Sequence, residues 1–105
     1  MERKVRALIK KPGEAAYIRH VEDKLEAWQE IVGGYIQTVT LFEDMTVICN
    51  EEGRLLGLPF NCDILGCDFA GTIVIVGVEG DEFADVPEEE KMRKWFPNLF
   101  KGGRK

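Results

Sequence analysis

The chain has 105 residues, of which 45% are apolar and 31% charged, and its formal net charge is −5. This length fits one domain, and the apolar content excludes a disordered or fibrous chain. No apolar run is long enough to span a membrane and no secretory leader is visible, so we expect a cytoplasmic protein without a membrane partner.

The charges are unevenly distributed along the chain. Residues 1–11 and 91–105 are net basic, whereas residues 12–90 carry most of the carboxylates. A net acidic protein is a poor match for a phosphate backbone, so we do not expect nucleic-acid binding. We expect one domain over residues 1–100 and a flexible basic tail over residues 101–105.

The first predicted elements form a β-hairpin. Residues 4–9 alternate between apolar and polar, which indicates a half-buried strand. Pro12 followed by Gly13 is typical of the centre of a type II turn. Residues 15–20 are therefore predicted to return as the second strand.

A helix is predicted over residues 23–32. Asp23 and Glu26 have the spacing of a capping box, and Gly33 can supply the left-handed conformation that ends a helix. Trp28 lies in the middle of the apolar stripe of this helix, so we expect it in the core.

Two strands are predicted over residues 35–41 and 46–49, joined by a turn at residues 42–45. We expect Gly53 to adopt positive φ in the following loop, and residues 54–57 to return as a short strand. Residues 58–71 show no periodicity. They are predicted to be an irregular loop, and long loops of this kind are often functional.

The strand predicted over residues 72–78 begins at Thr72, ends at Val78 and is almost entirely apolar. A strand with two apolar faces is a central strand that needs cover on both sides. Part of this cover could come from a second copy of the chain, so the pattern also predicts a homodimer through this strand.

A second helix is predicted after Asp85, which resembles an N-cap followed by Pro87 and Glu88. It should end near Phe96 because a proline follows. Its apolar stripe is predicted to bury four side chains: Met92, Trp95, Phe96 and Leu99. Glu89 and Arg93 have the spacing of a surface ion pair.

The order of these elements predicts an α+β fold. Tight turns between neighbouring strands favour a mainly antiparallel β-sheet of about five strands. Each of the two amphipathic helices has one apolar stripe, so we expect a two-layer domain in which both helices cover one face of the sheet.

The sequence lacks the usual groups for catalysis. There is no serine and only one histidine, His20, and no glycine-rich phosphate loop is present. The three cysteines, Cys49, Cys62 and Cys67, do not have the spacing of a metal site. We therefore expect no enzyme, no cofactor and no metal, although a thiol- or metal-dependent enzyme that uses Cys62, Cys67 and His20 stays open.

The region from residue 50 to residue 71 is the strongest candidate for a binding surface. It combines polar groups with aliphatic and aromatic side chains, as binding loops do. The candidate residues are Asn50, Glu51, Leu58, Phe60, Asn61 and Asp63.

Three segments together resemble a known family. They are residues 25–36, residues 50–61 (with Asn50-Glu51-Glu52-Gly53 and Gly57-Leu58-Pro59-Phe60-Asn61) and residues 71–77 (Gly-Thr-Ile-Val-Ile-Val-Gly). In this order they are similar to the uncharacterised bacterial and phage family called domain of unknown function 3846. The resemblance implies no catalytic residue. It does imply an accessory protein encoded by a phage or mobile element.

These observations favour a small, non-enzymatic interaction protein. Its acidic surface and the 50–71 loop would bind a protein partner. The alternative is a small-molecule binding module, for a nucleotide or a metabolite, with a pocket at the same loop. Mimicry of DNA by the acidic surface is also open.

Overall fold

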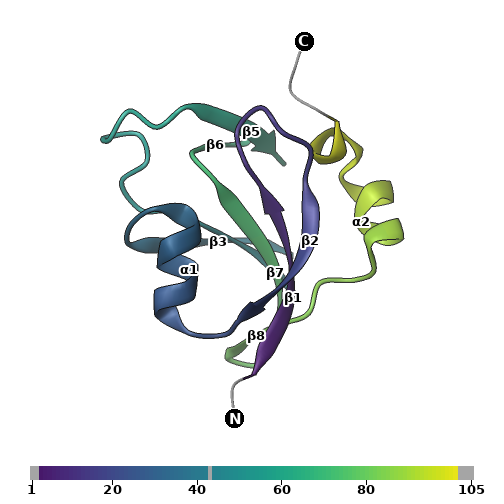
Figure 1. Cartoon of the computed structure of the whole chain (residues 1–105). Helices are drawn as coiled ribbons and strands as arrows, with labels where there is room; N and C mark the ends of the chain where they lie inside the picture. The colour runs from purple at the N-terminus through teal and green to yellow at the C-terminus, as the bar shows by residue number, and fades with distance from the viewer. Residues whose placement is uncertain (1–2, 43, 102–105) are drawn as a thin grey trace.

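The computed structural model describes residues 3–42 and 44–101. Six strands form an antiparallel sheet in the order β2-β1-β7-β4-β3, in which β8 also pairs with β7 (Figure 1). Two further strands, β5 and β6, form a separate antiparallel hairpin. The strands are β1 (Lys4–Lys10), β2 (Tyr17–Glu22), β3 (Ile36–Phe42), β4 (Met45–Asn50), β5 (Phe60–Ile64), β6 (Cys67–Ala70), β7 (Ile73–Glu79) and β8 (Glu82–Ala84).

The predicted central strand is confirmed as β7. It pairs with β1 on one side and with β4 on the other. Ile73 and Ile75 belong to the core on one face of the sheet, and Val74 and Val76 belong to the core on the opposite face. Both faces and both edges of β7 are therefore covered within the chain. The burial of β7 does not require the second copy that the apolar sequence suggested.

The α+β class and the antiparallel sheet are confirmed, but the helices do not share one face. Helix α1 (Leu25–Val32) packs on the Val74 side, whereas α2 (Glu89–Trp95) and the short 3-10 helix η1 (Pro97–Phe100) pack on the Ile75 side. Figure 1 shows α1 and α2 on opposite sides of β1 and β7. The reason is that the central strands are apolar on both faces, and each face needs its own cover.

Helix α1 differs from the prediction at its first turn. Its N-cap is Lys24, which makes no side-chain cap hydrogen bond, so the capping box of Asp23 and Glu26 is wrong. Its end is as predicted, because Gly33 has φ of 81°. Trp28 is buried with 1% of its surface exposed, which confirms its place in the core.

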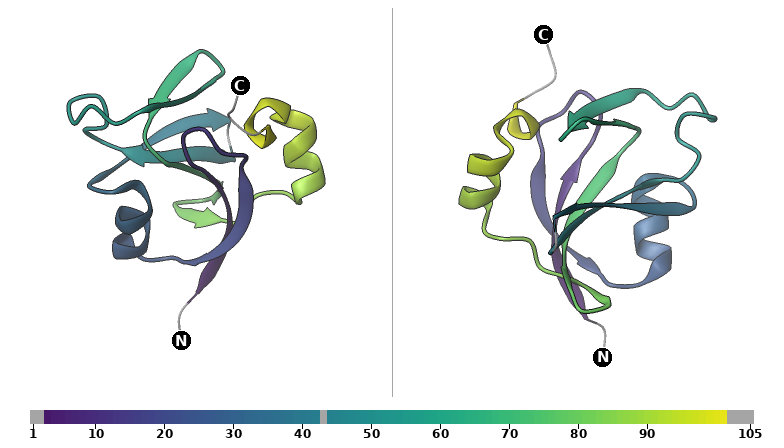
Figure 2. Two further views of the ribbon diagram at one scale, coloured as in Figure 1. Left: turned by 45° about the horizontal axis from the view of Figure 1, so that its top comes forward. Right: turned by 180° about the vertical axis from the view of Figure 1, so that it is seen from behind.

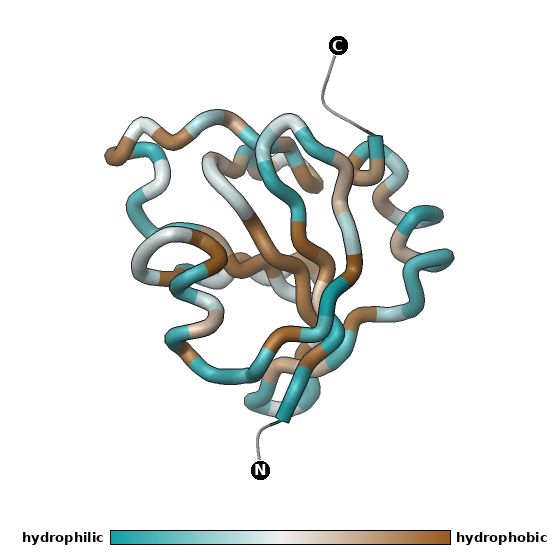
Figure 3. The backbone as a smooth tube through the Cα atoms, in the orientation of Figure 1, coloured by the Kyte–Doolittle hydropathy of each residue, from teal (hydrophilic) through white to brown (hydrophobic). Residues whose placement is uncertain are grey.

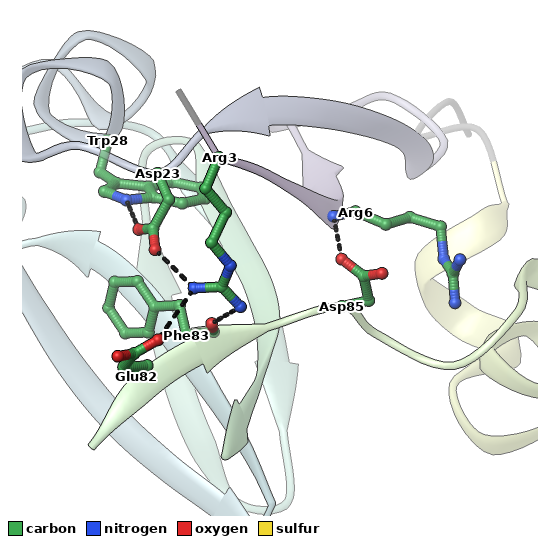
Figure 4. A network of polar contacts seen from close by, with 7 residues as sticks. All are labelled: Arg3, Arg6, Asp23, Trp28, Glu82, Phe83 and Asp85. Carbon is green, nitrogen blue, oxygen red and sulfur yellow. Dashed lines mark hydrogen bonds and ion pairs between the residues drawn. The ribbon is translucent and has the colours of Figure 1, made fainter. Parts of the chain in front are cut away.

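Asp23 instead belongs to a network that joins three segments of the chain. Its carboxylate accepts a hydrogen bond from Trp28 Nε1 at 3.2 Å and pairs with Arg3 Nη1 at 3.0 Å (Figure 4). Arg3 also bonds to Glu82 and to the carbonyl of Phe83 on β8. This Asp23 network joins the start of α1 to the residue before β1 and to β8.

Helix α2 also lacks the predicted cap. Its N-cap is Glu88, without a side-chain hydrogen bond, and Asp85 accepts the backbone N–H of Arg6 at 2.7 Å (Figure 4). Asp85 therefore stabilises the connection after β8 rather than the helix. The predicted ion pair is present, with Arg93 Nε at 2.8 Å from Glu89 Oε2.

Three of the four predicted apolar positions near α2 are buried, namely Met92, Phe96 and Leu99. Trp95, by contrast, is 50% exposed, so its predicted burial is wrong. The helix ends at Trp95, one residue before the Phe96-Pro97 step, as the proline predicted. The chain then continues as η1, which returns Leu99 to the core.

Residues 54–71 depart most from the prediction. Residues 54–57 form turns and not a strand, and most of residues 58–71 form the β5–β6 hairpin. The two-residue loop of this hairpin has positive φ at both positions, 52° at Leu65 and 87° at Gly66, as a type I′ turn requires. Leucine rarely adopts positive φ, so the sequence does not indicate such a turn. This explains why the hairpin was not predicted.

Two predictions fall partly on residues that the structure does not describe. The turn predicted at residues 42–45 includes Glu43, and the predicted basic tail includes residues 102–105, which all lie outside the described residues. Among the described helices, none is long and apolar enough to cross a membrane.

Candidate functional site

The loop over residues 51–58, between β4 and β5, has a defined backbone. Leu56 N–H donates to the carbonyl of Glu52 at 2.9 Å, and Leu58 N–H donates to the carbonyl of Gly53 at 3.0 Å. The positive φ expected at Gly53 is found at Gly57 instead, at 72°. Gly53 is needed for space, because a Cβ there would lie 3.0 Å from the carbonyl oxygen of Ala70. The loop is thus held against β6.

This loop displays large apolar side chains to solvent. Leu55 is 86% exposed, Leu56 58% and Phe60, the first residue of β5, 64%. Figure 3 shows the hydrophobic tip of the loop projecting away from the sheet. We call these three residues the loop patch. Three large apolar side chains are exposed within six consecutive residues, so the loop patch is a candidate contact surface.

Asn50 was a candidate binding residue, but its side chain has a structural role. It is buried, and its Nδ2 donates to the carbonyl of Val32 at the end of α1, at 3.2 Å. Its Oδ1 accepts the N–H of Glu52 at 2.7 Å. The amide therefore joins α1 to the start of the loop, and it is not displayed to a ligand.

Asn61 is likewise buried and fully bonded within the chain. Its Nδ2 donates to the carbonyls of Lys10 at 2.8 Å and Gly71 at 2.7 Å. Its Oδ1 accepts a hydrogen bond from Lys10 Nζ at 3.0 Å. Since the Lys10 side chain is only 4% exposed, this contact joins the β5–β6 hairpin to the end of β1 inside the molecule.

The other four candidate residues differ in their exposure and in their contacts within the chain. Asp63 is exposed, and its Oδ1 accepts the N–H of Gly66 at 3.1 Å in the hairpin turn. Leu58 is half-buried and packs so closely on Gly71 that a Cβ there would lie 2.7 Å from its Cδ1. Glu51 and Phe60 are exposed, so they remain available to a partner.

A hollow of about 450 Å³ lies between β3, β4, the loop and β6. Its wall includes Gln37 and Val39 of β3, and its rim carries three carboxylates and one guanidinium. The charged residues are Glu51, Glu52, Asp68 and Arg54. The sequence analysis missed Gln37, Val39 and Arg54, because nothing in a strand pattern reveals which loop will lie beside it.

A larger hollow, of about 770 Å³, lies between β2 and α1. Its lining mixes basic residues, among them Lys11 and Arg19, with the carboxylates of Glu22, Glu26 and Glu30. None of the six candidate binding residues lines it, but His20 does. Its mixed charges favour no single ligand class, so its size does not make it the better candidate.

Two of the three thiols are less acidic than a free cysteine. Cys49 is buried, and burial raises the pKa of its thiol. Burial also raises the pKa of Cys62 to about 11, against the opposing effect of Lys10 and with a further rise from Asp63. Thiols with raised pKa values are poor nucleophiles at neutral pH. Within residues 3–42 and 44–101, no group of three or more His, Cys, Asp and Glu side chains could hold a metal ion.

Comparison with known proteins identifies the family and little else. No curated protein and no solved structure gives a significant match to the chain. The model of one family, described as a domain of unknown function (DUF3846), matches residues 5–99, which include all the strands and both α-helices except for one residue of β1. The chain therefore belongs to the DUF3846 family, as its sequence segments predicted.

Proposed function

We propose that the chain is a non-enzymatic interaction protein that binds a protein partner through the loop patch and the carboxylates beside it. The observation that carries this proposal is the exposure of Leu55 and Leu56 on a loop that is fixed by its own hydrogen bonds, and of Phe60 at the start of β5. A loop with a defined backbone loses little conformational entropy when a partner binds it.

The sizes of the exposed side chains support a protein partner. Full burial of one leucine or phenylalanine side chain is worth about 1.5–3 kcal/mol. Three such side chains can therefore form the centre of an interface, since a few buried anchors dominate binding energy. The rim carboxylates of Glu51 and Glu52 favour a partner whose apolar pocket has basic surroundings.

The test is a capture experiment with the double variant Leu55→Ser and Phe60→Ser. We expect a partner retained by the wild-type chain to be lost with this variant, because both anchors are removed while no buried group changes. The matched control is Leu25→Ser, which replaces a leucine that is 53% exposed on α1, far along the chain from the loop. It should retain the partner.

Two outcomes would refute the proposal. One is a partner that binds the double variant as well as it binds the wild type. The other is a partner lost equally with Leu25→Ser, which would indicate a non-specific apolar contact. Asn61→Ala is unsuitable in this test, because it would disturb the buried contact with Lys10 and lower stability.

The hollow beside β3 favours a second candidate, the binding of a nucleotide or metabolite. Its volume of about 450 Å³ lies within the usual range for small-molecule sites. Ligand binding to the folded state raises the melting temperature. A thermal-shift screen of nucleotides and metabolites should therefore give a shift that is lost with Gln37→Ala; no shift across the screen would exclude this candidate.

A further inference from the structure

The strand β3 lies at one edge of the main sheet and pairs only with β4. The view from behind looks onto this side, where no further strand lies beyond β3 (Figure 2, right). An edge strand presents unpaired backbone groups that can bind another extended chain. The binding properties of this edge depend on which backbone groups of β3 point away from β4.

The register identifies the free backbone groups. Glu51 N–H donates to the carbonyl of Tyr35, so the pair of residues 35 and 51 is hydrogen-bonded across β3 and β4. In an antiparallel ladder bonded and non-bonded pairs alternate. The N–H and C=O groups of Ile36, Thr38 and Thr40 therefore point away from the sheet, and within residues 3–42 and 44–101 no backbone group pairs with them.

The two edges of the sheet differ in their protection. The opposite edge is β2, and charged side chains such as those of β2 are a common defence of edge strands. In contrast to β2, whose charged side chains are Arg19 and Glu22, β3 has the sequence Ile-Gln-Thr-Val-Thr-Leu-Phe, without a charge or a proline. Its only irregularity is a bulge between Thr40 and Phe42, beyond the free groups. The unprotected edge is therefore the β3 edge.

The same edge borders the hollow described above. Gln37 and Val39 point to this face of the sheet and line the hollow. Three carboxylates on its rim, Glu51, Glu52 and Asp68, outnumber the one guanidinium, Arg54. A strand added beside β3 would place alternate side chains over this acidic rim. We propose that the outer edge of β3 accepts an extended, basic segment of a partner protein, which joins the sheet as an additional strand.

The charges favour such a segment over a second copy of the chain. A second copy would bring its own Glu51, Glu52 and Asp68 toward the same carboxylates, and the chain has a net charge of −5. A segment with arginine or lysine at alternate positions is attracted to the rim, and β-branched residues between them would pack beside Thr38 and Thr40. This inference rests on the proposed function, because it specifies how the partner binds beside the loop patch.

The first test uses a labelled peptide of alternating arginine and threonine, as long as β3, and measures fluorescence anisotropy on the intact chain. Two versions carry N-methyl groups on alternate backbone amides, one set for each edge of the peptide. Only one edge can face β3, so one version should lose affinity by at least about tenfold and the other should bind like the parent. A peptide with glutamate in place of arginine should bind at least about tenfold more weakly than the parent.

The second test changes the protein. Thr38→Pro removes an N–H that points outward and leaves the ladder with β4 intact, which edge strands tolerate. We expect it to abolish peptide binding, whereas Thr38→Val, which keeps the N–H, should not. A circular dichroism spectrum that matches the wild type verifies the fold of each variant, and the methylated peptides keep the test decisive should Thr38→Pro not fold.

Several results would overturn the inference. Equal binding by both methylated peptides, or peptide binding that survives in Thr38→Pro, would exclude strand addition. Self-association that Thr38→Pro abolishes, without peptide binding, would make a second copy the occupant. If a captured partner is lost with Leu55→Ser and Phe60→Ser but retained by Thr38→Pro, the proposed function stands and only the strand addition fails.

Discussion

The Asp23 network makes a quantitative prediction about stability. Replacement of Asp23 by alanine removes the acceptor for Trp28 Nε1, which lies 3.2 Å from Asp23 Oδ1. Because the Trp28 side chain is 1% exposed, the indole N–H would lose its partner in a largely dry environment. An unsatisfied buried donor destabilises a protein by about 1–3 kcal/mol.

The ion pair with Arg3 adds little to this value. The side chain of Arg3 is 46% exposed, and pairs that solvent reaches contribute about 0–1 kcal/mol. Arg3 also keeps its bonds to Glu82 and to the carbonyl of Phe83 when Asp23 is replaced. We therefore expect Asp23→Ala to lower the free energy of unfolding by roughly 1–4 kcal/mol in total, most of it from the unpaired indole N–H.

The matched control is Asp23→Asn, which keeps an oxygen acceptor for the indole and removes only the charge. It should lower stability by less than about 1 kcal/mol. Urea unfolding followed by circular dichroism measures both variants without depending on the fluorescence of Trp28. The reasoning is refuted if the alanine variant is within about 0.5 kcal/mol of the wild type, or if both variants lose the same amount.

Three further predictions concern the β5–β6 hairpin. Asn61→Ala removes the donor to two buried carbonyls and leaves the Lys10 ammonium with only the carbonyl of Lys11, so it should lower stability by about 3 kcal/mol in chemical unfolding, whereas Phe60→Ala should change it by less than about 0.5 kcal/mol. Leu65→Asn relieves a leucine at φ of 52° and should raise stability by about 0.5–1 kcal/mol in the same assay; a loss would contradict the type I′ turn. The pKa of Cys62 is raised from 9.0 to about 11, so the unfolded chain loses this proton first, and the stability that the protonated thiol contributes should decline as pH rises from 9 through about 11. Cys62→Ala should show a weaker decline in unfolding experiments over that interval, and an identical pH dependence would contradict the assignment.

Local sequence patterns were sufficient to predict the strands and helices whose sequences follow a single periodicity. The alternation of residues 4–9 and the apolar run of residues 72–78 identified two of the main strands, and the stripe around Trp28 identified α1. In each case the pattern and the burial have the same physical cause, because the side chains that repeat are those that face the core.

The β5–β6 hairpin could not be predicted in this way, because distant contacts stabilise it. Asn61 and Asp68 disfavour strands by local preference. Asn61 is nevertheless accommodated, since Lys10, which is 51 positions away, supplies its hydrogen-bond partners. The same fact explains why buried residues were predicted as site residues. A polar side chain in a predicted loop looks available to a ligand, although another segment of the folded chain already binds it.

The distribution of the helices shows a similar limit. The apolar stripes of α1 and α2 indicated that each covers a sheet face, but a stripe does not say which face. The two-sided apolar pattern of residues 72–78 contained that information. Combined with the apolar residues at 5, 7, 8 and 9, it would have favoured one helix on each side.

The position of β7 has a consequence for biosynthesis. The two strands on either side of it, β1 and β4, are made much earlier, yet no hydrogen bonds join them to each other. While a ribosome is still translating the segment before Ile73, the nascent chain can form only separate hairpins. The position between β1 and β4 that β7 will occupy is then still empty. The sheet can close only after Glu79 has left the exit tunnel, and until then the hairpins expose apolar surface that favours aggregation.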